Sequence, residues 1–178
     1  MSDVVVRIPV ESWSITELTK ETYCCCFQPV QIWGDDVEVE IFLPTAIGTK
    51  EMAKDAAISA VPLLEEELAW LHMNKGELGK ALEWAKERAE EWIWDDPDFV
   101  ELSDNEGYVE LDGETVCVPI SDEAFLNSLF LWSVIFEQVD GAGSFKMSVE
   151  LGNKPDYFAG HRIHMDIDEH KNFVNQGL

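Results

Sequence analysis

Between Ala89 and Phe145 the chain has no lysine, arginine or histidine, yet this stretch carries fifteen carboxylates. A second stretch without bases runs from Glu21 to Thr49, and the whole chain has 12 basic and 36 acidic residues, a formal net charge of −24. Such an imbalance destabilises a compact state by self-repulsion. The acids are interleaved with Trp, Phe, Leu and Val, however, and 46% of all residues are hydrophobic. The sequence therefore predicts a folded domain rather than a disordered acidic tail.

The charge also limits the partners that such a domain can bind. A strongly acidic protein repels nucleic acid and anionic membranes and attracts basic protein surfaces. The start of the chain, Met1 to Arg7, lacks a basic segment followed by a long apolar one, so no signal peptide is expected. No window approaches about 18 apolar residues without a charge, so no transmembrane helix is expected. We expect a cytoplasmic protein that binds neither nucleic acid nor membranes directly.

The N-terminal part, about residues 4–43, is predicted to form strands. Residues 23–30 have the composition of one strand, and residues 37–43 alternate apolar and acidic side chains before becoming fully apolar. This alternation is typical of a half-buried strand with Glu38 and Glu40 facing outward. Residues 34–36, Gly-Asp-Asp, are predicted to form the turn between the two strands.

The central part, about residues 50–94, is predicted to form two amphipathic helices. Pro62 must either kink the first helix or begin another one. Asp95-Asp96-Pro97-Asp98 is expected to end the second helix, and Gly76 and Gly79 flank the break between the two. Apolar residues recur at helical spacing in both, at Met52, Ala56, Ala60, Leu63, Leu64, Leu68 and Leu71 and then at Leu78, Leu82, Ala85, Ala89, Trp92 and Ile93.

The C-terminal part, about residues 108–168, is predicted to be rich in strands. Asp112-Gly113 suits a type I′ turn between strands 108–111 and 114–118. Ser121 is expected to cap a short helix that runs to about Leu129. Further strands are predicted at 131–139, 144–151 and 162–168, with a turn at Asp140 to Gly143 between the first two. The whole chain, residues 1–178, is thus predicted to be a single α+β domain with antiparallel sheets, two central amphipathic helices and a C-terminal hairpin or meander.

Three of the four histidines lie within ten residues, which raises the possibility of a metal site. In a strand over 162–168, Ile163, Met165 and Ile167 would face the core and His164 and Asp166 the other side. Imidazole and carboxylate are suitable ligands for zinc, iron or manganese. The alternative is a solvated outer face with weak charge pairing. The candidate metal ligands are His161, His164, Asp166 and His170.

The four cysteines do not form a disulfide framework, because three of them, Cys24, Cys25 and Cys26, are consecutive. They are interpreted as buried or half-buried strand thiols. A metal or redox role for the triplet requires that another element supply further ligands. The chain has no phosphate-binding glycine loop, G-x-S-x-G, H-E-x-x-H or complete EF-hand loop, so no catalytic residue or cofactor is predicted.

The end of the second helix and the segment after it form the predicted partner-binding surface. An exposed tryptophan within an acidic rim is a plausible anchor for a basic partner, because tryptophan is enriched at interface hot spots. The candidate residues are Trp94, Asp95, Asp96, Asp98, Glu101, Asp104 and Glu106.

Several C-terminal motifs resemble those of one bacterial or phage family of unknown function. They are the run Phe130 to Phe136, Asp140-Gly141 followed by Ser144-Phe145, and Tyr157 to Ile163. Together with the order of strand, helices and hairpin, they resemble domain-of-unknown-function family 2262 over roughly residues 36–170, mainly 130–163. Where that family carries an acidic-Leu-Phe-Trp run, this chain has Asp156-Tyr157-Phe158-Ala159. The resemblance implies a fold, with Gly160 and His161 as signature positions, but no activity.

Three functions are compatible with these patterns. The leading hypothesis is a non-enzymatic inhibitor, immunity or anti-defence protein whose acidic face mimics nucleic acid. It would bind a basic protein such as a nuclease, a toxin or a nucleic-acid-binding defence complex. The second is a metal-binding protein or small metal-dependent enzyme that uses the histidine cluster. The third is an accessory or oligomerisation domain whose charge serves solubility.

Overall fold

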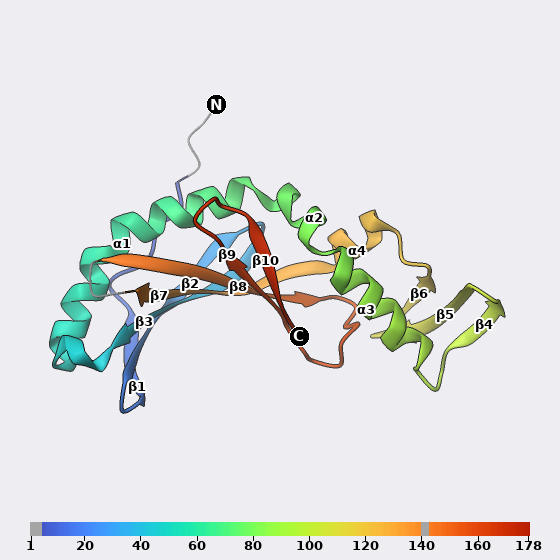
Figure 1. The fold of residues 1–178 in the computed structure, drawn as a ribbon, viewed down its shortest axis with the longest axis horizontal. Helices are drawn as coiled ribbons and strands as arrows, with labels where there is room; N and C mark the ends of the chain where they lie inside the picture. The colour runs from blue at the N-terminus through green and yellow to red at the C-terminus, as the bar shows by residue number, and fades with distance from the viewer. Residues whose placement is uncertain (1–4, 140–142) are drawn as a thin grey trace.

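The computed structural model describes residues 5–139 and 143–178, which form an α+β fold with two sheets (Figure 1). The larger sheet has seven strands. In spatial order they are β1 (Trp13–Thr19), β2 (Thr22–Ile32), β3 (Asp35–Pro44), β7 (Leu129–Val139), β8 (Ser144–Asn153), β9 (Ile163–Ile167) and β10 (Phe173–Gly177). The smaller sheet has three strands, β4 (Val100–Ser103), β5 (Glu106–Leu111) and β6 (Glu114–Val118). The helices are α1 (Lys50–Met73), α2 (Leu78–Ala81), α3 (Glu83–Trp94) and α4 (Asp122–Ser128), with short 3-10 turns η1 (Thr45–Ile47) and η2 (Lys75–Glu77).

The seven-stranded sheet consists of two antiparallel meanders joined by one parallel pair. Strands β1 to β3 form the first meander and β7 to β10 the second. Strand β3 pairs with β7 in parallel, with Glu38 opposite Ser133. The prediction of antiparallel sheets was therefore wrong for this pair. The chain between β3 and β7 passes through all four helices and the smaller sheet, and a connection of this length allows two strands to pair in parallel. The predicted turn at Asp140 to Gly143 lies outside the described residues, except for Gly143.

The hairpin between β2 and β3 turns at Trp33 and Gly34, both of which have positive φ. The predicted turn at residues 34–36 was therefore one residue late, and Asp35 already belongs to β3. Between Phe27 and Val30 the register with β3 shifts by one residue, next to Pro29. A proline cannot donate to the ladder, which explains an irregularity at this position.

Helix α1 runs without interruption through Pro62 and follows a curved path along the larger sheet (Figure 1). Its N-cap is Thr49, whose side chain accepts a hydrogen bond from the backbone N–H of Met52 at 3.3 Å. Pro62 is exposed, as is Ile58 one turn earlier, so water can solvate the carbonyl that loses its helical partner.

The predicted apolar stripe of α1 was right in its second half and one residue out of phase in its first half. Leu64, Leu68 and Leu71 are fully buried, but Met52 and Leu63 are exposed. The buried positions before Leu64 are Ala53, Ala57 and Val61. Small apolar residues stand in adjacent pairs here, such as Ala56-Ala57. The pattern of apolar and polar residues therefore did not decide which side of the helix faces the sheet.

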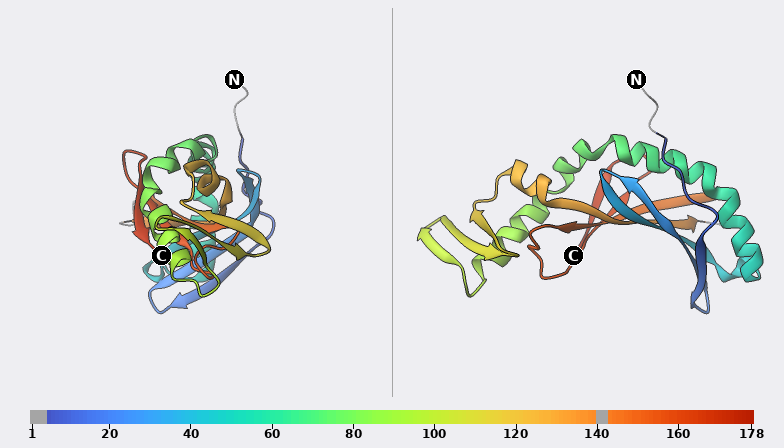
Figure 2. Two further views of the ribbon diagram at one scale, coloured as in Figure 1. Left: turned by 90° about the vertical axis from the view of Figure 1, so that its right-hand side faces the viewer. Right: turned by 180° about the vertical axis from the view of Figure 1, so that it is seen from behind.

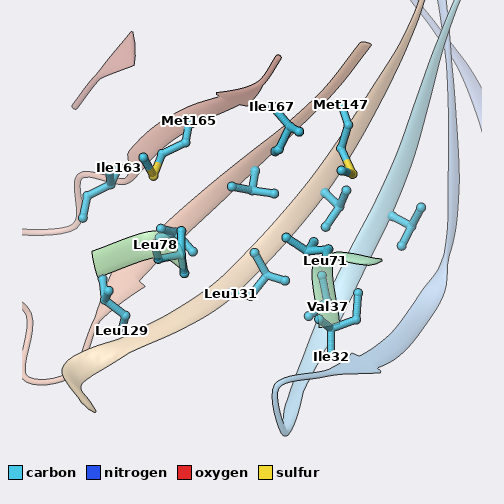
Figure 3. Close-up of a cluster of buried hydrophobic side chains, with 14 of the residues drawn as sticks. Ile32, Val37, Leu71, Leu78, Leu129, Leu131, Met147, Ile163, Met165 and Ile167 are labelled. Carbon is cyan, nitrogen blue, oxygen red and sulfur yellow. The ribbon is translucent and has the colours of Figure 1, made fainter. Parts of the chain in front are cut away.

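The main core lies between the larger sheet and the α1–α2 segment (Figure 3). In each central strand, alternate residues point into it: Val37, Val39, Ile41 and Leu43 from β3, and Ile163, Met165 and Ile167 from β9. Leu71 and Leu78 meet these side chains from the helices. Burying a side chain of this size stabilises the fold by roughly 1.5–3 kcal/mol, so this layer supplies most of the driving force.

The smaller sheet projects from one end of the molecule, beyond α3 (Figures 1 and 2). Its β5–β6 hairpin is confirmed, with positive φ at Asp112 and Gly113 and Leu111 paired with Glu114. Strand β4 was not predicted. Ser121 caps α4 as expected, because its side chain accepts a hydrogen bond from the N–H of Ala124 at 3.1 Å.

Candidate functional site

The acidic segment 95–118 forms the α3–β4 connection and the whole smaller sheet, at one end of the molecule. It contains nine carboxylates and no base. Eight of the nine are on exposed residues, namely Asp95, Asp98, Glu101, Asp104, Glu106, Glu110, Asp112 and Glu114. In the described part of the chain no ion pair involves any of the nine. We refer to residues 95–118 as the acidic end.

The acids of the acidic end do not all play the same part. Asp96 is half-buried, and its Oδ1 accepts a hydrogen bond from the N–H of Asp98 at 2.9 Å, which shapes the turn after α3. Asp112 accepts from the N–H of Asp156 at 2.9 Å and so ties the β5–β6 turn to the segment after β8. The side chains of Glu101, Asp104 and Glu106 accept no hydrogen bond from any residue that the structure describes, and all three are exposed.

The strand pairing separates two faces of the smaller sheet. Val109, Val116 and Val118 are buried on the inner face. On the outer face Tyr108 pairs with Cys117, flanked along β5 by Glu106 and Glu110. The predicted residue Glu106 thus lies on the solvent face, and Glu110, which was not among the candidates, lies beside it.

Trp94 is half-buried rather than exposed, because its ring packs on that of Phe99 with centroids 4.4 Å apart. The exposed apolar side chains of the acidic end are Val100 and Leu102 in β4, with 42% and 68% of their surface accessible. Strand β4 is an edge strand with every residue exposed. The structure therefore offers Leu102, in place of the predicted Trp94, as the apolar contact within the acidic rim.

The four candidate metal ligands near the C-terminus do not converge. His164 and Asp166 share the outer side of β9, with Nε2 of His164 3.6 Å from Oδ1 of Asp166. Asp166 is also paired with Lys146, whose Nζ lies 2.6 Å from Oδ2. His161 instead packs against the ring of Trp92 at 5.4 Å, before β9 begins. His170 lies beyond the other end of β9, in an exposed turn beside Glu169.

His164 and Asp166 belong to a polar face on the larger sheet, opposite the core. Paired residues of adjacent strands point to the same side, and the register aligns Cys26, Glu40, Ile135, Ser148 and Asp166 across five strands. Helices α1 and α2 lie on the other side of this sheet (Figures 1 and 2). A second row aligns Glu38, Ser133, Glu150 and His164, and Ser133 donates to Glu150 at 3.1 Å.

Three of these side chains form a compact cluster. The Sγ atoms of Cys24 and Cys26 are 3.3 Å apart, and Sγ of Cys26 is 3.7 Å from Oε1 of Glu40. Within residues 5–139 and 143–178, this is the one group of three potential metal ligands whose donor atoms all lie within 4.8 Å of one another. We refer to Cys24, Cys26 and Glu40 as the thiol–carboxylate cluster.

Burial alters the acidity of the cluster and of its neighbours. It raises the pKa of the Cys24 and Cys26 thiols, and it raises the pKa of Cys25, on the core side of the same strand, to about 11. Burial likewise raises the pKa of the Glu40 carboxyl, and the nearby Glu38 and Glu150 carboxylates add to this shift. Without a bound cation the thiols are therefore neutral at pH 7.

The sequence suggested the thiols but not their third partner. The cysteine triplet needed a ligand from another element, and Glu40 of β3 meets that need because it pairs directly with Cys26. The hairpin itself carried this information. If the strand pairing is extended back from the two-residue turn at Trp33 and Gly34, Cys26 lies within one residue of the position opposite Glu40.

Across the described ranges 5–139 and 143–178, every helix is too short or too polar to cross a bilayer.

Comparisons with curated proteins and with solved structures found no match. A family model matches residues 14–178, further in both directions than the resemblance seen in the sequence, and it includes the cysteine-rich strand β2. From this match over most of its length, the chain belongs to DUF2262, a family of uncharacterized proteins conserved in bacteria.

Proposed function

We propose that this protein is a non-enzymatic interaction protein whose acidic end binds a basic surface of another protein. The observation that carries this proposal is the concentration of nine carboxylates without a base in residues 95–118, at one end of the molecule. The closest preceding bases are engaged elsewhere, since Lys86 pairs with Asp122 and Arg88 with Glu91. A field of one sign at one end steers an oppositely charged partner toward that end.

The exposed edge strand β4 supplies the apolar part of the proposed interface. Protein interfaces combine a desolvated apolar centre with a polar rim, and charge alone gives rate and specificity more than affinity. Val100 and Leu102 are exposed on either side of Glu101 in the sequence, and the Asp104–Asn105 turn and Glu106 follow them. We therefore expect Leu102 to enter an apolar recess in the partner, with the carboxylates around it contacting lysines and arginines.

The chemistry of this surface favours a partner that normally handles nucleic acid. Such proteins present grooves lined with lysine and arginine, which a rigid array of carboxylates can occupy in place of phosphates. In a bacterial family, nucleases, toxins and nucleic-acid-binding defence complexes are the partners of this type, and the protein would act on them as an inhibitor or immunity protein.

Affinity capture from a bacterial lysate at low salt and again at high salt, with the partner identified by mass spectrometry, tests this proposal. A basic partner should be retained at low salt and released at high salt, because screening shortens the Debye length from about 10 Å at 0.1 M to about 3 Å at 1 M. The double variant Glu101→Lys/Glu106→Lys should lose the captured partner. Leu102→Ser should weaken its retention at low salt.

A matched control separates the acidic end from net charge. Glu17→Lys/Asp55→Lys makes the same change in charge at exposed positions of β1 and α1, at the other end of the molecule (Figure 1). This variant should retain the partner. Equal loss in both double variants, or retention that does not respond to salt, would contradict the proposal.

A further inference from the structure

The thiol–carboxylate cluster has the dimensions of a metal site. In a tetrahedral zinc centre with Zn–S near 2.3 Å and Zn–O near 2.0 Å, two sulfurs lie about 3.8 Å apart and a sulfur and an oxygen about 3.5 Å apart. The observed separations are 3.3 Å between the Cys24 and Cys26 sulfurs and 3.7 Å between Cys26 Sγ and Glu40 Oε1. A small rotation of one side chain would bring each separation to its ideal value.

The backbone holds these ligands in place. Cys24 and Cys26 are alternate residues of β2 and so point to the same side, and Glu40 is paired with Cys26 on β3. Strands β2 and β3 each have a neighbouring strand on both sides, so neither is an edge of the sheet. Ligands on interior strands lose little freedom on binding, which makes the site preorganised.

The surroundings favour a cation. Glu40 lies near two further carboxylates, Glu38 and Glu150, on the same polar face. Cys24 is nearly fully buried, whereas Cys26 and Glu40 are half-buried. The cluster is therefore accessible to an ion from one side only, and a fourth coordination position there is open to water.

We propose that Cys24, Cys26 and Glu40 bind one thiophilic divalent metal ion, Zn²⁺, with the fourth position open to solvent. Two sulfur ligands select against Mg²⁺ and Ca²⁺, which prefer oxygen. Binding displaces the thiol protons to solvent, so that two thiolates and one carboxylate surround the ion. Three protein ligands and one open position are the arrangement in which zinc keeps a bound water. The site is on the larger sheet and is independent of the proposed role of the acidic end.

Metal titration of the full-length, untagged and reduced protein tests the proposal. After treatment with a chelator, Zn²⁺ is added in competition with a chromophoric chelator, and the stoichiometry is counted by native mass spectrometry. We expect one ion per chain. Co²⁺ bound in its place should give a sulfur-to-cobalt charge-transfer band, which reports thiolate ligation in the unaltered protein.

Variants identify the ligands. Cys24→Ser/Cys26→Ser should abolish the charge-transfer band and weaken binding by more than the roughly 10- to 100-fold that loss of an outer-shell partner costs. Glu40→Gln should weaken binding but keep the band. Cys117→Ser removes the exposed cysteine of the smaller sheet and should bind as the unaltered protein does.

Two results would overturn the proposal. The first is metal binding that survives in Cys24→Ser/Cys26→Ser or disappears in Cys117→Ser. The second is unaltered protein that binds Co²⁺ without the charge-transfer band, a measurement that needs no variant to fold.

Discussion

The two sheets of this protein handle negative charge in opposite ways. On the larger sheet, some acids lie beside groups that compensate them: Asp166 pairs with Lys146 at 2.6 Å, and Glu150 accepts a hydrogen bond from Ser133. On the smaller sheet, the acids are exposed, and no ion pair among the described residues reaches them. The charge of the acidic end thus lies where water and salt screen it best, and the main core under α1 is largely free of charge.

The largest contrast between the two regions should appear in side-chain truncation. Leu68→Ala removes a fully buried side chain from the α1 face of the larger core and should lower the free energy of unfolding by about 2–5 kcal/mol. Leu102→Ala on β4 should change it by no more than about 0.5 kcal/mol. Urea denaturation of both variants measures the difference. Similar losses would mean that β4 is buried in solution, for example against a second chain.

The smaller sheet should be most sensitive at Gly107. A Cβ atom there would clash with the ring of Phe99 and lie 2.7 Å from the carbonyl oxygen of Val100. Gly107→Ala should therefore push β4 away from β5 and cost about 1–3 kcal/mol. Hydrogen exchange should accelerate in residues 100–111 and stay unchanged in β3 and β7. Gly76→Ala, where a Cβ meets nothing within 4 Å, is the control and should leave exchange as it is.

Removing charge from the acidic end should stabilise the protein, unlike most substitutions. Glu106 and Glu110 lie on the same face of β5, so Glu106→Gln/Glu110→Gln reduces the self-repulsion of the acidic end and should raise the free energy of unfolding by up to about 0.5 kcal/mol at low salt. The gain should vanish at high salt. Asp166→Asn, which removes the partner of Lys146 on the larger sheet, should have the opposite sign. A gain that persists in high salt would point to packing rather than charge.

The smallest effect should come from Asp168, at the turn between β9 and β10. The side-chain and backbone hydrogen bonds from Asn172, with one from the backbone of His170, hold the pKa of Asp168 below its usual value. A lowered pKa in the folded state adds stability that is present above the ordinary carboxyl pKa and is lost as the pH falls through the lowered one. Asp168→Asn should therefore be slightly less stable at neutral pH, and the difference should disappear in acid. Thermal unfolding of both proteins from neutral to acidic pH measures the difference. A difference that grows in acid would contradict a lowered pKa of Asp168.

The parts of the fold that could be predicted are those with a local signal. The alternation in residues 37–43 and 163–167 correctly identified which side of β3 and β9 is buried, and Asp112-Gly113 and Ser121 correctly identified a turn and a cap. Each of these rests on a period or a backbone preference that acts over a few residues.

The parts that could not be predicted depend on contacts between distant segments. Nothing near β3 indicates that it pairs with β7. Phe99 is close to Trp94 in the sequence, but the contact of the two rings depends on how the turn after α3 folds back. The acidic end could be found in the sequence as a run without bases. Its position at one end of the molecule depends on the direction in which α3 carries the chain away from the larger sheet. The thiol–carboxylate cluster is intermediate between the predictable and the unpredictable parts. Its hairpin could be predicted, but an error of one residue in the register gives Glu40 the wrong partner.

The parallel pairing of β3 with β7 has a consequence for how the chain folds. Each meander closes through short connections, whereas the join must bring Glu38 to Ser133 across all of the intervening helices and the smaller sheet. Contacts of such long sequence separation form slowly, so we expect the two meanders to form first and their docking to limit the refolding rate. A refolding rate that does not respond to Val39→Ala or Val134→Ala at the join would contradict this order. The intervening segment, residues 45–128, then acts as a tether whose length and docking set the speed at which the two halves of the sheet find each other.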